Sequence, residues 1–294
     1  MPLADYPVFQ LQLESSERIE ELGSKAKFWV RLPDESSWLF KFGRPNTGED
    51  WAEKLGAEVA ELLGLPHAHV ELAMFNEKHG SVSRSFRPKE FDLIHGNEIL
   101  AGHVLGYDAA KEFGQSDHTF GRIISAFYSI FAEGPDRTEA LTLLAGYLTL
   151  DAIIGNVDRH HENWGVLRST SSETPGLQIA PTFDHASSLG RELRDEKRRD
   201  LLRQKRVADY VRKGCGGIYW KETDPNGANP LALATRAAKT HRSYFQRWLD
   251  RIKDIAPKEL DLLVSKVPQD WMSPIAKEFA VAILSYTTEQ LKKL

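Results

Sequence analysis

Residues 155–164 read Gly-Asn-Val-Asp-Arg-His-His-Glu-Asn-Trp, and a second short stretch, Phe183-Asp184, follows further along the chain. The first stretch comes directly after residues 141–154, an apolar run with the character of a helix. It contains two carboxylates, two histidines and two asparagines. Surface loops seldom gather so many groups that can bind a metal or carry a proton, so this stretch is the first candidate for a functional site.

The spacing of three of these residues indicates a chemistry. Asn163 lies five positions after Asp158, and Asp184 comes later. Phosphoryl transfer needs one carboxylate to orient and deprotonate the attacking hydroxyl, and oxygen ligands to hold Mg²⁺ against the phosphates. Protein kinases place a catalytic Asp and a metal-binding Asn at this separation, with a metal-binding Asp downstream. An isolated Asp–Asn pair would more often cap helices or start a turn. The complete set favours catalysis.

The composition limits the class of protein. The chain has 294 residues, 41% hydrophobic and 27% charged, with a net charge of −4 and a pI near 6.2. This is typical of a soluble globular protein, and the acidic balance argues against direct binding of nucleic acid. The single cysteine, Cys215, excludes an internal disulfide and fits a reducing compartment. No membrane span or secretory leader is evident, so we expect a cytoplasmic protein that does not bind a membrane.

The first third of the chain is rich in strand patterns. Alternation of apolar and polar residues predicts strands over residues 8–13, 28–32 and 38–42, arranged as a β-meander. A helix is predicted over residues 49–63. Lys41 stands in the third strand, where it is either an outward, solvated residue or a charge that binds nucleotide phosphates. Glu53 and Glu58 on the helix are candidates to pair with it.

The remainder of the chain is rich in helix patterns. We predict helices at residues 119–131, 137–154, 191–213, 231–255, 257–266 and 273–294. A strand-rich part followed by a helical part predicts an α+β fold with two lobes. We place the N-lobe at residues 1–105 and the C-lobe at residues 106–294.

Two segments carry a family pattern. Residues 156–163, Asn-Val-Asp-Arg-His-His-Glu-Asn, and residues 180–188, Ala-Pro-Thr-Phe-Asp-His-Ala-Ser-Ser, together resemble the HipA-like serine/threonine kinases. These are bacterial kinases, and several are the toxins of toxin–antitoxin systems. The resemblance extends more weakly over most of the chain. It implies a two-lobed protein-kinase-like fold, use of ATP and Mg²⁺, transfer of phosphate to Ser or Thr of a protein substrate, autophosphorylation as in several members, and an antitoxin partner.

The resemblance also implies roles for single residues. Asp158 corresponds to the catalytic aspartate, and His160 to a histidine that keeps the catalytic loop in shape. Asn163 and Asp184 correspond to the Mg²⁺ ligands. The positions that would contact the nucleotide through the phosphates or the adenine are Lys41, the phosphate-covering loop with Gly23 and Ser24, and the interlobe hinge Ser83, Arg84, Ser85 and Phe86.

Ser24 is also the candidate autophosphorylation site. The chain departs from the family in two respects. It is shorter than full-length HipA, and we expect it to lack the separate N-terminal subdomain and a partner protein to supply that part. No acidic residue follows Phe86 directly, which leaves the ribose contact unassigned.

Three other functions stay open at this stage. The same fold could serve a small-molecule phosphotransferase, because the catalytic set does not fix the substrate. The chain could be a non-catalytic nucleotide-binding partner of an antitoxin. His160, His161, Asp184 and His185 could form a hydrolase metal site, although adjacent histidines seldom point at one ion. The basic run at residues 191–206 is either a solvated face or a docking surface for an acidic protein or an RNA-bound substrate.

Overall fold

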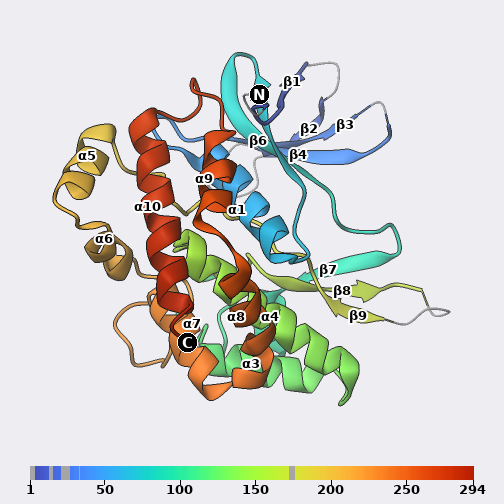
Figure 1. Ribbon diagram of the computed structural model, residues 1–294. Helices are drawn as coiled ribbons and strands as arrows, with labels where there is room; N and C mark the ends of the chain where they lie inside the picture. Colours follow the sequence, from blue (N-terminus) through green and yellow to red (C-terminus); the bar gives the residue numbers. More distant parts are fainter. Residues whose placement is uncertain (1–3, 13–15, 21–26, 33, 172–175) are drawn as a thin grey trace.

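The computed structural model describes residues 4–12, 16–20, 27–32, 34–171 and 176–294. The N-terminal part forms a six-stranded sheet with the strand order β1-β5-β6-β4-β3-β2 (Figure 1). Gly23 and Ser24, the predicted phosphate-covering loop, lie outside the described residues. The strands are β1 Val8–Leu11, β2 Ser16–Glu20, β3 Lys27–Arg31, β4 Ser37–Phe42, β5 Val70–Phe75 and β6 Lys78–Arg84.

The predicted meander is wrong in its pairing. β3 and β4 are antiparallel neighbours, but β1 runs parallel to β5, with Val8 opposite Leu72. The strand β2, which was not predicted, pairs with β3 instead. Alternation along a strand identifies which residues face the core, and it does not say which strand lies alongside.

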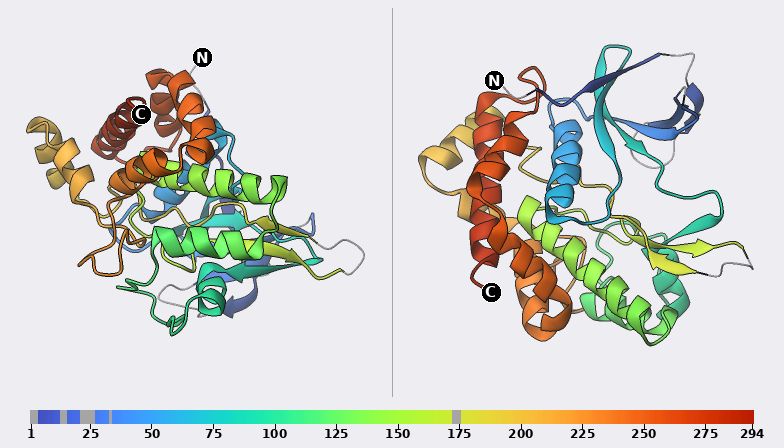
Figure 2. Two further views of the ribbon diagram at one scale, coloured as in Figure 1. Left: turned by 90° about the horizontal axis from the view of Figure 1, so that it is seen from below. Right: turned by 45° about the vertical axis from the view of Figure 1, so that its right-hand side comes forward.

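Helix α1, Glu49–Leu63, lies between this sheet and the helical part of the molecule (Figures 1 and 2). Its predicted bounds are confirmed, and Gly64 ends it in the left-handed conformation at φ 75°. The helix is buried on nearly every side. Even Glu49, Asp50 and Glu53 are at most 6% exposed, so the sheet and the helices enclose several of its charges.

A second, three-stranded sheet has its central strand directly after residues 155–164 of the candidate site. Its order is β7-β8-β9, with β7 Phe91–His95, β8 Gly165–Ser169 and β9 Leu177–Ile179. The β7–β8 pair joins segments far apart in the sequence, with His95 opposite Gly165. The boundary at residue 105 between the two predicted lobes stays a prediction; β7, which precedes it, pairs with β8, which follows it.

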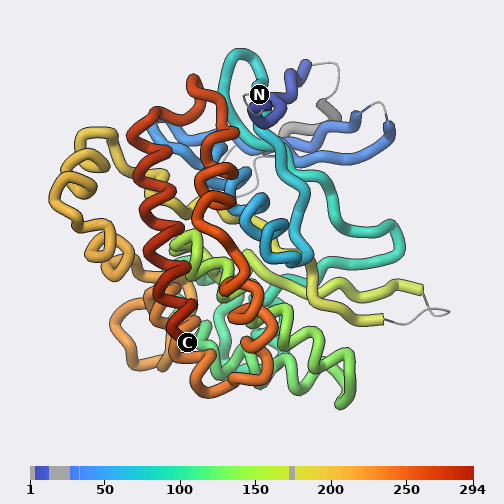
Figure 3. The backbone as a smooth tube through the Cα atoms, viewed as in Figure 1, coloured from blue at the N-terminus to red at the C-terminus, as the bar shows by residue number. Residues whose placement is uncertain are grey.

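The C-terminal part is helical, and α4 runs through its centre. Almost every residue from Ala140 to Ile154 is buried, which explains why this run is apolar on all sides. The tube in Figure 3 ends with α10, packed beside α4 and α5. The helices are α2 Gly96–His103, α3 Phe120–Ile130, α4 Pro135–Ile154, α5 Asp195–Arg203, α6 Val207–Lys213, α7 Pro230–Thr240, α8 Arg242–Asp254, α9 Pro257–Ser265 and α10 Pro274–Leu291.

Two long helices of the prediction are each divided. Residues 191–213 form α5 and α6, and between them Lys205 adopts φ 54°, a conformation that a helix does not contain. Residues 231–255 form α7 and α8, which are separated at His241. The predicted α+β class, with a β-sheet N-terminal part and a helical C-terminal part, is confirmed. Among the described residues, no helix combines the length and the apolar character needed to cross a membrane.

Candidate active site

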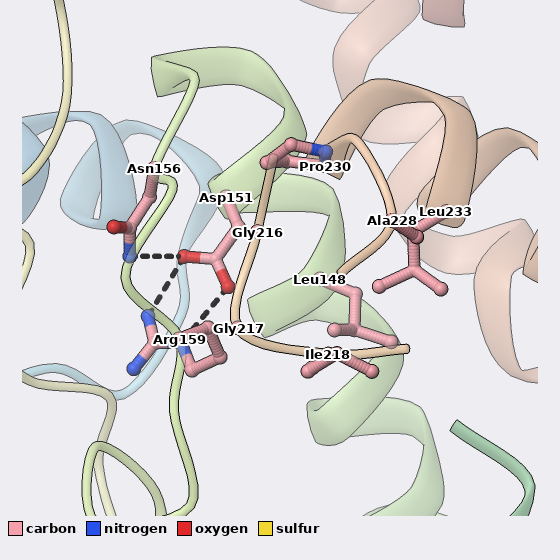
Figure 4. Close-up of a pocket in the computed structure, with 10 residues that line it drawn as sticks. All are labelled: Leu148, Asp151, Asn156, Arg159, Gly216, Gly217, Ile218, Ala228, Pro230 and Leu233. Atoms are coloured by element: carbon pink, nitrogen blue, oxygen red, sulfur yellow. Dashed lines mark hydrogen bonds and ion pairs between the residues drawn. The ribbon is translucent and has the colours of Figure 1, made fainter. Parts of the chain in front are cut away.

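The loop after α4 begins with a buried ion pair. Gly155 ends α4 at φ 65°, and the chain turns back over Asp151 in its last turn. The Asp151 carboxylate accepts hydrogen bonds at 2.8 Å from Asn156 Nδ2 and from Nε and Nη2 of Arg159. Figure 4 shows the three side chains together, beside a small cavity that they share with residues 216–218. The two charges neutralise each other where neither reaches water.

Arg159 also joins the two sequence segments that carry the family pattern. Its Nη1 donates to the carbonyls of Asn163 and, at 2.9 Å, of Phe183, and Nη2 donates to Thr182 Oγ1 at 3.1 Å. Burial opposes its charge, but the carboxylates of Asp151, Asp184 and Glu53 together outweigh burial and raise the pKa of the guanidinium. One buried cation therefore fixes residues 158–163 relative to residues 182–184.

Asp158 and Asn163 contact each other directly. Asn163 Nδ2 donates to the Asp158 carbonyl at 2.8 Å, and the Asp158 N–H donates to Asn156 Oδ1 at 3.1 Å. The Asp158 carboxylate is partly exposed and accepts the Ser187 hydroxyl at Oδ2, at 3.2 Å. Because the amide nitrogen of Asn163 is committed to Asp158, the amide oxygen is the atom that remains to bind a cation.

Asp184 faces the N-terminal sheet. It has φ 59°, the left-handed region that aspartate enters more readily than most residues. Its Oδ2 lies 3.0 Å from Lys41 Nζ, which comes from β4. Burial opposes the charge on Lys41, but the carboxylates of Asp184 and Glu53 outweigh it and raise the pKa of the ammonium group. Lys41 is thus a charged residue directed at Asp184, not an outward residue on a solvated face.

The two α1 glutamates proposed as partners of Lys41 differ in their surroundings. Glu53 is 1% exposed, and its Oε2 accepts the backbone N–H of His185 at 2.8 Å, directly beside Asp184. Glu58 pairs instead with Lys54, at 2.7 Å. Of these two candidates, Glu53 is the one whose carboxylate helps to raise the pKa of Lys41.

The histidines of the loop have separate environments. His160 is partly exposed, and its Nδ1 accepts the Glu162 N–H at 3.3 Å, which supports a role in shaping the loop. His161 is buried, and its Nδ1 is bonded to the Tyr107 hydroxyl at 2.8 Å. His185 is also buried, and burial together with the Arg159 charge holds its pKa well below the usual value.

These environments contradict the hydrolase metal site. In the described parts of the chain, the only cluster of three or more His, Cys, Asp or Glu side chains close enough to share an ion is Glu112, His160 and Glu162. His161 and His185 are held by other partners, and neither joins a ligand set with Asp184.

Two backbone N–H groups of the predicted hinge are hydrogen-bonded within the protein. The N–H of Arg84 donates to the His69 carbonyl and that of Ser85 to the Ser37 carbonyl, both at 2.8 Å. Phe86 stacks on Phe183, with ring centroids 5.5 Å apart and an angle of 29°. The N–H groups of Arg84 and Ser85 are therefore not available to a base, whereas the two rings form an apolar surface next to Asp184.

The donor set fits magnesium. Asp184 offers a carboxylate and Asn163 an amide oxygen, and Mg²⁺ prefers a few hard oxygen ligands that leave room for water and phosphate. Soft or nitrogen ligands are absent from this pair, so the residues do not favour zinc.

Several residues of the site were missed in the sequence. They are Asp151, Arg159, Ser187, Arg191 and Glu49. A signal existed for one of them: Asp151 is the only charged residue in the apolar run at residues 141–154, and a lone buried carboxylate requires a partner. No sequence pattern indicates the contacts of the other four.

Comparisons with known proteins show the family and the fold of the chain. The model of the HipA-like C-terminal domain matches residues 21–259. The structure is similar to that of the Helicobacter pylori proinflammatory kinase CtkA, with a TM-score of 0.79 and 18% identity over 98% of this chain and 96% of that one. It also resembles a chain of the Shewanella oneidensis MR-1 toxin–antitoxin complex of HipA, HipB and operator DNA, with a TM-score of 0.55, 14% identity, and coverage of 97% and 70%.

A curated relative gives a short match in sequence. The serine/threonine-protein kinase CtkA of H. pylori strain J99 is 51% identical over 39 residues, which cover 13% of this chain and 11% of that protein. At these identities the solved structures establish the kinase-like fold that the resemblance implied.

Proposed function

The chain belongs to the family of HipA-like C-terminal domains, and we propose that it is an ATP- and Mg²⁺-dependent serine/threonine protein kinase. The observation that carries the proposal is the arrangement around Arg159. This residue holds Asp158 and Asn163 next to the segment of Asp184, and Asp184 in turn meets Lys41 from the sheet. A charged lysine, a general base and two oxygen ligands are the groups that phosphoryl transfer requires.

In this proposal each residue has one task. The Asp158 carboxylate orients the substrate hydroxyl and accepts its proton. Lys41 binds the phosphates of the nucleotide, while Asn163 and Asp184 hold magnesium. When bound, the metal neutralises charge on the phosphate oxygens. His160 keeps the loop in shape through its bond with the Glu162 N–H.

The segment Ser83–Phe86 is proposed to bind the nucleotide base. Because the N–H groups of Arg84 and Ser85 are used within the protein, we propose that adenine is recognised through the remaining backbone groups of this segment and by the apolar faces of Phe86 and Phe183. Gly23 and Ser24 are proposed to cover the phosphates, with Ser24 as an autophosphorylation site. An antitoxin-type partner and a cytoplasmic location belong to the same proposal.

The test is phosphate transfer from radiolabelled ATP by the purified full chain, with host lysate proteins as acceptors. Asp158→Asn and Asp184→Asn are each expected to lower the rate by about 100-fold or more. Only Asp184→Asn is expected to weaken the binding of Mg·ATP as well. Asp261→Asn, an exposed position on α9, is the matched control and should leave the rate unchanged.

Three results would contradict the proposal. The first is full activity in either Asp158→Asn or Asp184→Asn. The second is label that enters metabolites of the lysate and no protein, which would indicate a small-molecule phosphotransferase. The third is ATP binding without transfer to any acceptor, which would indicate the non-catalytic binding partner.

A further inference from the structure

Ser187 contacts the proposed catalytic base in two ways. Its hydroxyl lies 3.2 Å from Asp158 Oδ2, and its carbonyl accepts the N–H of Val157 at 3.1 Å. The side chain is 7% exposed, so water does not compete freely for it. Ser187, three positions after Asp184, is thus hydrogen-bonded to the catalytic loop at Asp158 and at its neighbour Val157.

Arg191 determines the direction of the Ser187 hydroxyl. Its Nη2 donates to Ser187 Oγ at 3.0 Å. A guanidinium has only donors, so the serine oxygen must accept this bond. The single hydroxyl proton of Ser187 is then left for Asp158 Oδ2. The other carboxylate oxygen of Asp158 stays available to a substrate hydroxyl.

Helix α1 fixes Arg191. Glu49, at the start of α1 and 3% exposed, accepts Nη1 of Arg191 at 2.6 Å, and the Gly48 N–H donates to the Arg191 carbonyl at 2.9 Å. Glu49 also lies 3.3 Å from Arg44, which follows the strand that carries Lys41. Hydrogen bonds and an ion pair therefore connect Arg44, two residues after β4, through Glu49, Arg191 and Ser187 to Asp158.

We propose that Ser187 is a positioning residue for Asp158 and that Arg191 and Glu49 act through it. The inference rests on the proposed kinase function and goes beyond it, because it assigns the orientation of the base to residues outside the catalytic loop. A carboxylate with one oxygen held by a directed donor loses rotational freedom before the substrate arrives, and pre-orientation of this kind raises the rate of the step without changing nucleotide affinity.

The test separates turnover from binding. Ser187→Ala is expected to lower kcat about tenfold, the effect of one lost hydrogen bond, with an unchanged KM for ATP. Ser187→Thr keeps the donor and should recover most of the rate. Arg191→Met should lower kcat to a similar extent, and the double variant should be no slower than Ser187→Ala alone. Arg168→Met, an exposed arginine of β8 outside the basic run, is the matched control.

Three kinetic outcomes would overturn the inference: a wild-type kcat in Ser187→Ala, equal losses in the Ala and Thr variants, or additive effects of the two substitutions. Detection of phosphate on Ser187 would also overturn it, because the residue would then be an acceptor.

A second measurement does not depend on activity. Hydrogen exchange of the peptide covering residues 155–163 should be faster in Ser187→Ala and Arg191→Met than in the wild type and Ser187→Thr. If the wild-type chain transfers no phosphate, the kinase proposal fails, and this exchange pattern still decides whether Ser187 holds the loop. Unchanged exchange in both variants refutes that role.

Discussion

Gly56 in the middle of α1 lies directly against His185, so closely that a Cβ atom at position 56 would stand 2.4 Å from the histidine Cβ. Real Cβ atoms do not approach each other at this distance. The backbone N–H of the same histidine is bonded to Glu53, one turn earlier on the helix. The absence of a side chain at position 56 is therefore what allows α1 to touch the residue that follows Asp184.

Gly56→Ala should separate the helix from this loop. Although alanine favours a helix, the clash with His185 is expected to cost about 1 to 3 kcal/mol in the free energy of unfolding, and to lower the rate of phosphate transfer. Gly121→Ala in α3 is the control, because a Cβ there meets nothing within 4 Å. That variant should be up to about 1 kcal/mol more stable. Urea unfolding of both variants measures the difference, and equal stability would contradict the packing argument.

Arg159→Met should destabilise the fold strongly. Removal of the guanidinium leaves the buried Asp151 carboxylate without its cation, which typically costs about 3 to 5 kcal/mol. Arg168→Met removes an exposed arginine whose ion pair with Asp92, at 3.9 Å, is also exposed, and should change stability by less than about 1 kcal/mol. Thermal or urea unfolding compares the two, and similar losses in both would show that burial of the pair is unimportant.

Lys41→Met should impair turnover far more than folding. The Lys41–Asp184 pair is more exposed than the Arg159–Asp151 pair, so its loss should cost less stability than the loss of Arg159, whereas the loss of a phosphate-binding charge should lower kcat/KM by about 100-fold. Lys258→Met, on the exposed face of α9, is the control. Steady-state kinetics with ATP as the varied substrate measure the effect. An unchanged kcat/KM would show that Lys41 has a purely structural role.

Asp50 gives a prediction about pH. Burial raises the pKa of its carboxyl group to about 7. Between about pH 4 and pH 7 the folded protein binds this proton and the unfolded chain does not, so the stability falls as the pH rises through that window. Asp50→Asn cannot titrate, and its amide oxygen can still accept the N–H of Trp51, which Asp50 Oδ1 accepts at 2.8 Å.

The gain in stability of Asp50→Asn over the wild type should therefore grow by roughly 2 to 3 kcal/mol between pH 5 and pH 8, at about 1.4 kcal/mol for each pH unit within the window. Burial lowers the pKa of His118 to about 3, which makes the folded state less stable below about pH 6.5. This effect is common to both proteins and cancels in the comparison. A difference that does not change with pH would refute the assignment to Asp50.

The sequence predicted the parts of the molecule that depend on local pattern. The bounds of α1 follow from an apolar stripe and Gly64. Helix α3 lies where its apolar periodicity predicts it, and α4 lies where the continuous apolar run predicts a helix. Strand partners depend on how the whole sheet assembles, and so the parallel pairing of β1 with β5 could not be derived from alternation. The break at Lys205 was also hidden, because no glycine or proline marks it.

In the candidate site, too, the sequence predicted local residues but not their long-range contacts. Asp158, Asn163 and Asp184 were identified from spacing, and the structure brings Lys41 to Asp184 and Asn163 to Asp158. Their assigned roles remain predictions. The supporting contacts of Arg191 and Glu49 join residues 142 positions apart, and each is an ordinary charged residue in its own neighbourhood. Only the folded chain shows that they meet.

The pairing of β1 with β5 has a consequence for how the protein folds while it is being synthesised. Leu11 lies opposite Phe75, so β1 has no neighbour in this pairing until the segment to residue 75 has been synthesised. In the same way, β7 lacks its partner β8 until residue 165 has been synthesised, since His95 lies opposite Gly165. During synthesis these two strands present unpaired edges of the kind that chaperones protect and that aggregation exploits. Slowing translation between residues 11 and 75 should therefore reduce the yield of native protein more than slowing it in the helical C-terminal part.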